Sequence, residues 1–304
     1  MISKFRIGAL VIILNFFASV AMIWGQDNPS LLQMAVPSLN IAPDARGGGM
    51  GDMGAATLPD INSQYWNAAK YAFMGSKAGV SLSYTPWLRK LVNDVALVNM
   101  TGYYKLGNSD LQAISASLRY FSLGEVNIWE NIGDVPYGLN PYEMAFDVAY
   151  SRKLSESYSM AVTLRYIRSD MGTDQNDESN AGNAFSADIS GYLEKYVLMG
   201  NAEALWSFGF NLSNIGSKIS YDGGNTNQYL PAKLTLGTGL LYPIDDYNQI
   251  GVYLDLNKYM VPYAPQKEEG ETDADYQTRV DDYKSWSSLS GMLKSFYRVH
   301  LTAC

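Results

Sequence analysis

A glycine-rich stretch near the N-terminus has the spacing of a nucleotide-binding loop. Gly49, Gly51 and Gly54 form a G-x-G-x-x-G pattern. Dinucleotide binding needs such a loop between a parallel strand and a helix, because the pyrophosphate lies at the N-terminus of that helix. The remainder of the chain has the pattern of antiparallel strands. We therefore expect these glycines to permit positive φ angles and close backbone packing instead.

The composition offers little for hydrolytic or metal chemistry. The chain has one histidine, His300, and one cysteine, Cys304. A Ser-His-Asp site would have to use His300, and a single cysteine makes neither a disulfide framework nor a cysteine metal site. We expect no enzyme activity and no cofactor.

Two acidic stretches lie in predicted loops. Neither matches the calcium-binding loop D-x-[DN]-x-[DN]-G, so they are either solvated loops or weak calcium sites. The net charge of −8 excludes nucleic acid as a partner, because neutralising phosphates needs a basic surface. The acidic residues are Asp170, Asp174, Asp177 and Glu178 in the first stretch, and Glu268, Glu269, Glu271, Asp273, Asp275, Asp281 and Asp282 in the second.

Apolar and polar residues alternate with a period of two from Lys77 onward. In one segment Trp206, Phe208 and Phe210 point to one side and Ser207 and Asn211 to the other. This period is that of a strand with one apolar and one polar face. The predicted strands span residues 77–84, 94–106, 112–121, 143–154, 158–168, 184–196, 205–213, 233–242 and 249–257.

The predicted connections between these strands alternate between short and long. Outer-membrane β-barrels have tight periplasmic turns and long external loops, and their strands have about ten residues. We therefore predict an all-β transmembrane antiparallel barrel, with a secreted all-β domain as the alternative. The first strand would start on the periplasmic side. The charged residues on the polar strand faces would line the lumen and balance one another's charge: Arg119, Asp147, Arg165, Asp188 and Asp255.

The N-terminus reads as an export signal. Lys4 and Arg6 precede an apolar run over residues 7–21, and small residues lead to a predicted mature start near Gln26. The alternative is an uncleaved membrane anchor. We predict a signal peptide at 1–25, an N-terminal lumen segment at 26–76 and the barrel at 77–296, located in the cell outer membrane.

The C-terminal part does not complete the predicted barrel. The last strand ends near Asn257, and the anomalous tail at 297–304 is no closing strand. A barrel in lipid must close to satisfy its backbone groups. We therefore expect an incomplete barrel, either because the chain is truncated near Phe296 or because another chain closes the edges.

A motif at residues 43–70 resembles the signature of the PorV family, an outer-membrane component of the type IX secretion system. Ala68 stands where that family usually has proline. The resemblance implies a FadL-like, fourteen-stranded barrel with this motif in its lumen. It further implies a protein that binds the C-terminal domain of secreted cargo and passes it from the translocon to the sortase-like attachment complex, with outer-membrane lipid around it. The motif residues include Asp44, Arg46, Gly49, Met50, Gly51, Gly54, Asp60, Trp66, Asn67 and Lys70.

A FadL-like channel for hydrophobic solutes is the alternative function. That channel needs an apolar pocket in its lumen, whereas the polar strand faces here predict a wet, filled interior. A surface enzyme barrel is a third class, disfavoured because the only histidine lies in the tail.

Overall fold

The computed structural model describes residues 32–87, 89–90, 94–107, 110–129, 135–172, 181–200, 202–222, 227–268, 270–297 and 302–303. The predicted signal peptide lies outside these residues. So do Asp174, Asp177, Glu178 and Glu269 of the acidic stretches, and His300 and Cys304.

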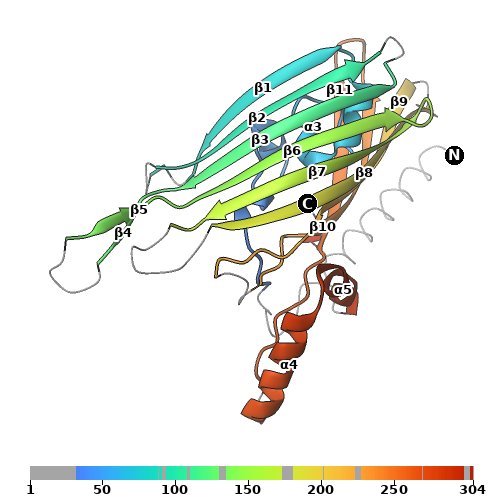
Figure 1. Ribbon diagram of the computed structural model, residues 1–304. Helices are drawn as coiled ribbons and strands as arrows, with labels where there is room; N and C mark the ends of the chain where they lie inside the picture. The colour runs from blue at the N-terminus through green and yellow to red at the C-terminus, as the bar shows by residue number, and fades with distance from the viewer. Residues whose placement is uncertain are drawn as a thin grey trace. The chain divides into compact units, whose positions relative to one another are not determined.

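Nine long strands form one antiparallel sheet in which spatial order follows chain order, and a two-residue strand pairs at the far edge (Figure 1). A separate hairpin, β4 (Val126–Ile128) and β5 (Tyr137–Leu139), lies between β3 and β6. The strands of the sheet are β1 (Ala78–Pro86), β2 (Val95–Leu106), β3 (Gln112–Leu123), β6 (Tyr142–Lys153), β7 (Tyr158–Asp170), β8 (Gly182–Met199), β9 (Ala202–Gly216), β10 (Lys233–Pro243), β11 (Gln249–Tyr259) and β12 (Thr302–Ala303).

The two faces of the sheet have inverted polarity relative to a water-soluble protein. We call the face with buried polar side chains the inner face; Thr101, Ser117 and Thr163 lie on it. Large apolar side chains cover the opposite, outer face, where Leu82 is 73% exposed and Phe185 is 68% exposed. Strand alternation places these sets on opposite sides. The prediction of one polar and one apolar face is therefore confirmed.

The sheet is open in the part of the chain that the structure describes. β1 pairs with β2 alone, and the opposite edge ends at β12, so no described strand joins the two edges. A closed barrel is therefore not seen, although the predicted all-β antiparallel architecture is confirmed.

The connections between strands alternate in length as predicted. Short turns at 107–111, 154–157, 200–201 and 244–248 lie at one end of the sheet. The long connections at 87–94, 124–141, 171–181 and 217–232, and the segment after β11, lie at the other end. Figure 1 shows the β4–β5 hairpin and helix α4 at this long-connection end.

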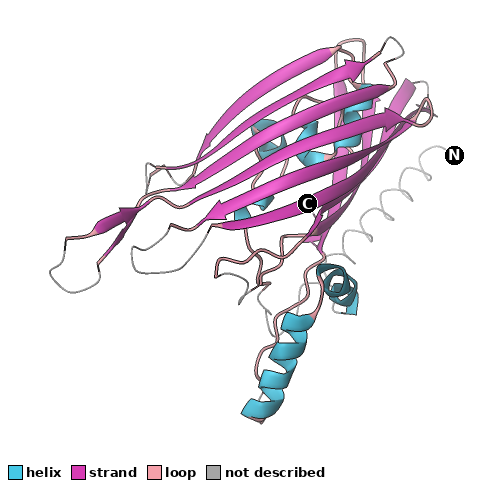
Figure 2. Cartoon of the chain, viewed as in Figure 1, coloured by secondary structure: helices cyan, strands magenta, loops and turns pink. Residues whose placement is uncertain are grey.

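Short helices lie against the inner face of the sheet (Figure 2). They belong to the N-terminal segment, by which we mean residues 32–76. These helices are η1 (Pro37–Asn40), α2 (Ala45–Gly49), α3 (Ser63–Trp66) and η2 (Ala68–Phe73). Among them η2 makes the broadest contact, touching β2, β3, β6, β7 and β8.

Two helices and a single helical turn follow β11. They are α4 (Asp273–Ser285), α5 (Ser288–Lys294) and the single turn η3 (Ser295–Tyr297). The hydroxyl of Thr272 caps α4 by accepting a hydrogen bond from the Asp275 N–H at 3.2 Å. Sequence reasoning assigned this part of the chain to a loop and was wrong. None of the helices in the described ranges is both long enough and apolar enough to cross a membrane.

Candidate functional site

Trp66 is the centre of the N-terminal segment. The carboxylate of Asp44 accepts a hydrogen bond from the Trp66 indole N–H at 2.8 Å and caps α2 by accepting another from the Gly47 N–H at 2.8 Å. Gly47 and Gly54 both lie against the indole, because a Cβ at either position would overlap the ring. Three predicted motif residues, Asp44, Gly54 and Trp66, therefore meet at one buried point.

Asn67 connects the N-terminal segment to itself and to the sheet. Its side-chain amide donates to the carbonyl oxygens of Ala55 and of Gly191 in β8, each at 2.9 Å. Its side-chain oxygen accepts from the Ala69 N–H at 3.1 Å and caps η2. Asn67 is fully buried, and its amide binds three backbone groups in the interior.

Lys70 is fully buried, and no ion pair is formed by its ammonium group among the described residues. The ammonium donates to the Gly54 carbonyl oxygen at 2.9 Å and to the Thr57 hydroxyl at 3.1 Å. Removal from water disfavours the charged form and lowers the pKa of Lys70 from 10.5 to about 8. Lys70 thus links Gly54 and Thr57 within the loop between α2 and α3.

The remaining motif residues lie toward the surface of the segment. Arg46 forms an ion pair with Asp60. Gly49 ends α2, and Met50 and Gly51 form the exposed turn after it, where Gly51 has a φ of 81°. The G-x-G-x-x-G pattern therefore begins at the last residue of a five-residue helix and does not follow a strand. Gly51 has the expected positive φ and Gly54 the expected close packing, whereas Gly49 has neither.

Polar side chains of the sheet form hydrogen bonds with the N-terminal segment. Asp255 of β11 accepts hydrogen bonds from the backbone N–H groups of Gly54 at 2.8 Å and Ala55 at 3.0 Å. Ser207 of β9 donates to the Ala56 carbonyl oxygen at 2.6 Å, and Asn211 of the same strand donates to the Trp66 carbonyl oxygen at 3.0 Å. Sequence reasoning placed Ser207 and Asn211 on the polar face but assigned them no role. Further bonds of this kind come from Ser115, Ser159 and Lys105.

A charged cluster lies beside this contact. Arg165 donates to Asp147 at 2.6 Å and to Asp188 at 2.8 Å, and also to the side chain of Asn214. Arg119 stands apart from this cluster, donating to the Ser38 carbonyl oxygen at 3.2 Å. Of the five charged residues predicted for the lumen, Asp147, Arg165 and Asp188 form one cluster, in which a single guanidinium lies between two carboxylates. Arg119 and Asp255 instead hold the N-terminal segment.

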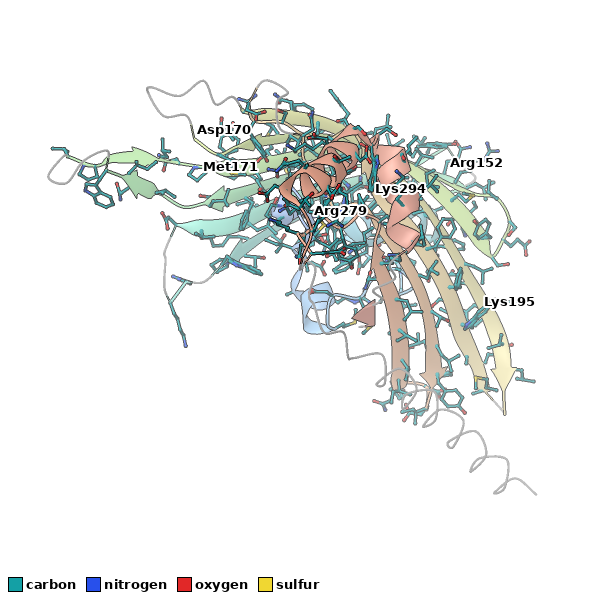
Figure 3. All side chains as sticks on the ribbon, turned by 90° about the horizontal axis from the view of Figure 1, so that it is seen from below. Arg152, Asp170, Met171, Lys195, Arg279 and Lys294 are labelled. Atoms are coloured by element: carbon teal, nitrogen blue, oxygen red, sulfur yellow. The ribbon has the colours of Figure 1, made fainter. Side chains whose placement is uncertain are left out.

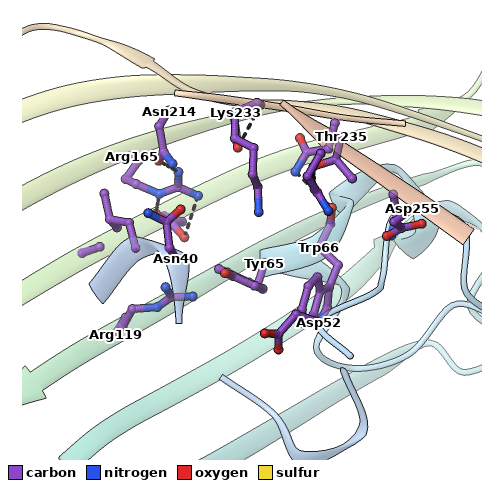
Figure 4. Close-up of a pocket in the computed structure, with 17 residues that line it drawn as sticks. Asn40, Asp52, Tyr65, Trp66, Arg119, Arg165, Asn214, Lys233, Thr235 and Asp255 are labelled. Atoms are coloured by element: carbon purple, nitrogen blue, oxygen red, sulfur yellow. Dashed lines mark hydrogen bonds and ion pairs between the residues drawn. The ribbon is translucent and has the colours of Figure 1, made fainter. Parts of the chain in front are cut away.

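A small cavity of about 20 Å³ lies between the charged cluster and the Trp66 centre (Figure 4). Lys233 and Thr235 of β10 also line it, and both are labelled in the figure. The buried oxygens Asn211 Oδ1 and Asp255 Oδ1 have no hydrogen-bond partner among the described residues. The cavity volume fits about one water molecule and leaves no space for a larger substrate.

The described residues contain no group of three or more histidine, cysteine or acidic side chains arranged to hold a metal ion. The inner face is thus a site of packing and hydrogen bonding between two parts of one chain. The charged and polar groups of this face bind atoms of the N-terminal segment or one another.

One comparison with known proteins gives a match that covers this region. A family model described as "Type IX secretion system protein PorV" matches residues 25–267, which include the described N-terminal segment and β1 to β11. Comparison with curated proteins gives no match. Helices α4 and α5 lie beyond the matched residues.

Proposed function

Because the chain belongs to the PorV family, and is therefore a component of the type IX secretion system, we propose that it is an outer-membrane β-barrel that binds secreted proteins. In this proposal it recognises the C-terminal domain of the cargo. It accepts the cargo from the translocon and passes it to the sortase-like attachment complex, without catalysing a reaction.

The outer face of the sheet supports a location in the membrane. Leu164 and Val80, on different strands, are 66% and 72% exposed. So much exposed apolar surface on one face is costly in water and favourable in lipid. Strands of this length suffice to cross a bilayer when tilted. Lipid also requires every edge to be paired, and a FadL-like barrel is the closed form that we propose.

The observation that carries the proposal is the filling of the inner face by the N-terminal segment. The cavity described above has room for one water molecule, and charged side chains such as Arg119 and Asp147 line it. A FadL-like channel would need an apolar pocket in its lumen that is large enough for its solute, and the small charged cavity on the inner face disfavours that alternative. A barrel with a filled interior is better suited to binding partners at its end.

The β4–β5 hairpin is the strongest candidate for a docking element at the long-connection end. Val126, Trp129 and Val135 are 47%, 59% and 89% exposed. Exposed aromatic and aliphatic side chains on a projecting element are typical of protein–protein contacts. Because the long connections face outward in the proposed topology, the hairpin would meet the translocon or the cargo outside the membrane.

Co-purification from detergent-solubilised outer membrane tests this function. The wild-type chain should recover the translocon, the sortase-like component or the cargo, and the double variant Trp129→Ala/Val135→Ser should recover less. Tyr247→Ala is the matched control, because Tyr247 is 95% exposed in a short turn at the opposite end of the sheet.

Two results would contradict parts of the proposal. Recovery of the wild-type chain alone, with long-chain fatty acid bound, would favour the channel. Equal recovery of partners by the hairpin variant and the wild type would show that the hairpin is not part of the docking surface. The proposed role in secretion would not be affected.

A further inference from the structure

Helix α5 and the turn η3 have two different apolar faces. Leu289, Leu293 and Phe296 lie at i, i+4 and i+7, and are 63%, 70% and 43% exposed. Residues at this spacing share one side of a helix. The adjacent side is buried and contains Gly291 and Met292. One side of α5 therefore packs against the protein, and the side with Leu289 and Leu293 is largely exposed.

The buried face of α5 packs on the outer face of the sheet. Met292 belongs to an apolar cluster that includes the partly buried Leu212 of β9 and Leu234 of β10. These two residues are paired in register and lie on the apolar side of their strands. Gly291 allows the close approach of the Tyr229 ring, since a Cβ there would lie 2.7 Å from a ring atom.

The C-terminal end of α5 is fixed to β11 by a lysine. Lys258 is the register partner of Leu234 and extends the row Leu212–Leu234–Lys258 across three strands. Its ammonium donates to the Ser295 carbonyl oxygen at 3.1 Å and lies 5.3 Å from the Phe296 ring centre. A cation at a helix C-terminus is stabilised by the free carbonyl groups there. Helix α5 thus lies along this row, at the long-connection end of the outer face.

The next row of the outer face lies beside the row on which α5 packs. It consists of Phe210, Leu236 and Leu256, which are paired in register. Leu236 and Leu256 are 41% and 37% exposed. In the proposed topology this row contacts lipid, and α5 covers the row next to it.

We propose that α5 is an interfacial helix whose Leu289, Leu293 and Phe296 insert into the outer surface of the membrane beside the ends of β9 to β11. The occupant of this face is lipid, because the face is continuous with the apolar outer face of the sheet. Lys294 lies over the Trp286 ring at 3.6 Å. A lysine and a tryptophan at the edge of an apolar stripe are suited to the headgroup layer. The inference rests on the proposed membrane crossing.

Spin labels on the full-length chain in lipid nanodiscs test the inference. In a Cys304→Ser background, single cysteines replace Leu289, Leu293, Leu236 and Asp281, and each carries a nitroxide. The label at Leu236 reports on the apolar outer face of the sheet, and Asp281 is an exposed position on α4. Figure 3 shows this end of the molecule, with Arg279 on α4 and Lys294 on α5 labelled. Heat-modifiable mobility on gels verifies that each labelled protein is folded.

We expect the labels at Leu289 and Leu293 to collide with oxygen more than with a water-soluble nickel chelate, as at Leu236, and the label at Asp281 to show the reverse. If Leu236 is lipid-exposed while Leu289 and Leu293 behave like Asp281, the interfacial helix is overturned and the membrane crossing stands. If Leu236 itself is water-exposed, the membrane crossing fails and the inference fails with it.

Discussion

At the scale of single residues, Asp255 determines how the N-terminal segment attaches to β11. Replacing it with alanine leaves the buried N–H groups of Gly54 and Ala55 without their acceptor. We expect Asp255→Ala to lower the free energy of unfolding by about 2–6 kcal/mol, since each of the two unsatisfied buried donors costs about 1–3 kcal/mol. Urea unfolding in lipid, followed by tryptophan fluorescence, measures this loss. The exposed Asp246→Ala is the control, and an equal effect of both changes would refute the attachment.

Lys70 makes the stability of the same segment depend on pH. Burial lowers its pKa from 10.5 to about 8, so between these values the unfolded chain binds more protons than the folded one. Stability therefore rises with pH across this window, by about 3 kcal/mol at most. Lys70→Met removes the titrating group. We expect the stability of the wild type relative to Lys70→Met to increase from pH 8 to pH 10, and a constant difference would contradict the assigned pKa.

The sequence predicted the positions of these residues better than their roles. Alternation placed Arg165, Asp147 and Asp255 on the polar face, because a period of two depends only on the backbone. It could not assign Asp255 to backbone N–H groups 200 residues away in sequence. Long-range partners of this kind leave no periodic signal, and the same holds for Ser207 and Asn211.

At the scale of elements, β9 approaches the N-terminal segment so closely that only glycine fits at one position. A Cβ at Gly209 would overlap the carbonyl oxygen of Ala55, whereas a Cβ at Gly102, on the outer face, would have its nearest neighbour at 3.5 Å. We expect Gly209→Ala to displace the segment and increase hydrogen exchange of the Gly54 and Ala55 amides. Gly102→Ala should leave that exchange unchanged. Equal protection in both variants would argue against tight packing of the segment on β9.

Each long strand could be predicted because its alternation extends over nine or more residues. The three-residue strands β4 and β5 are too short to show a period. Helix α4 has no buried residue and therefore no apolar stripe. Arg279 of α4 instead forms an ion pair at 2.7 Å with Glu271, which precedes the helix. Such a helix reads in sequence as a charged loop.

At the scale of the whole molecule, the apolar outer face and the alternating lengths of the connections are two independent features of a sheet that crosses a membrane in the proposed way. Consecutive antiparallel strands place successive connections at opposite ends, so a difference in length sorts them by side. The sequence predicted both features. The sequence pattern could not predict what pairs with the edge strands β1 and β12. Closure of a barrel depends on which strands meet in space, and the pattern of a single strand does not contain that information.

The proposed topology places α4 outside the cell and the turn at 244–248 in the periplasm. In a Cys304→Ser background, we expect Asp275→Cys on α4 to react with a membrane-impermeant maleimide on intact cells. Tyr247→Cys should react only after the outer membrane is permeabilised, although Tyr247 is 95% exposed, because the membrane rather than the protein shields it. Labelling of Tyr247→Cys but not Asp275→Cys on intact cells would invert the topology. Equal labelling of both variants on intact cells would show that no membrane separates the two ends of the sheet. The proposed membrane crossing, which explains the apolar outer face, would then be wrong.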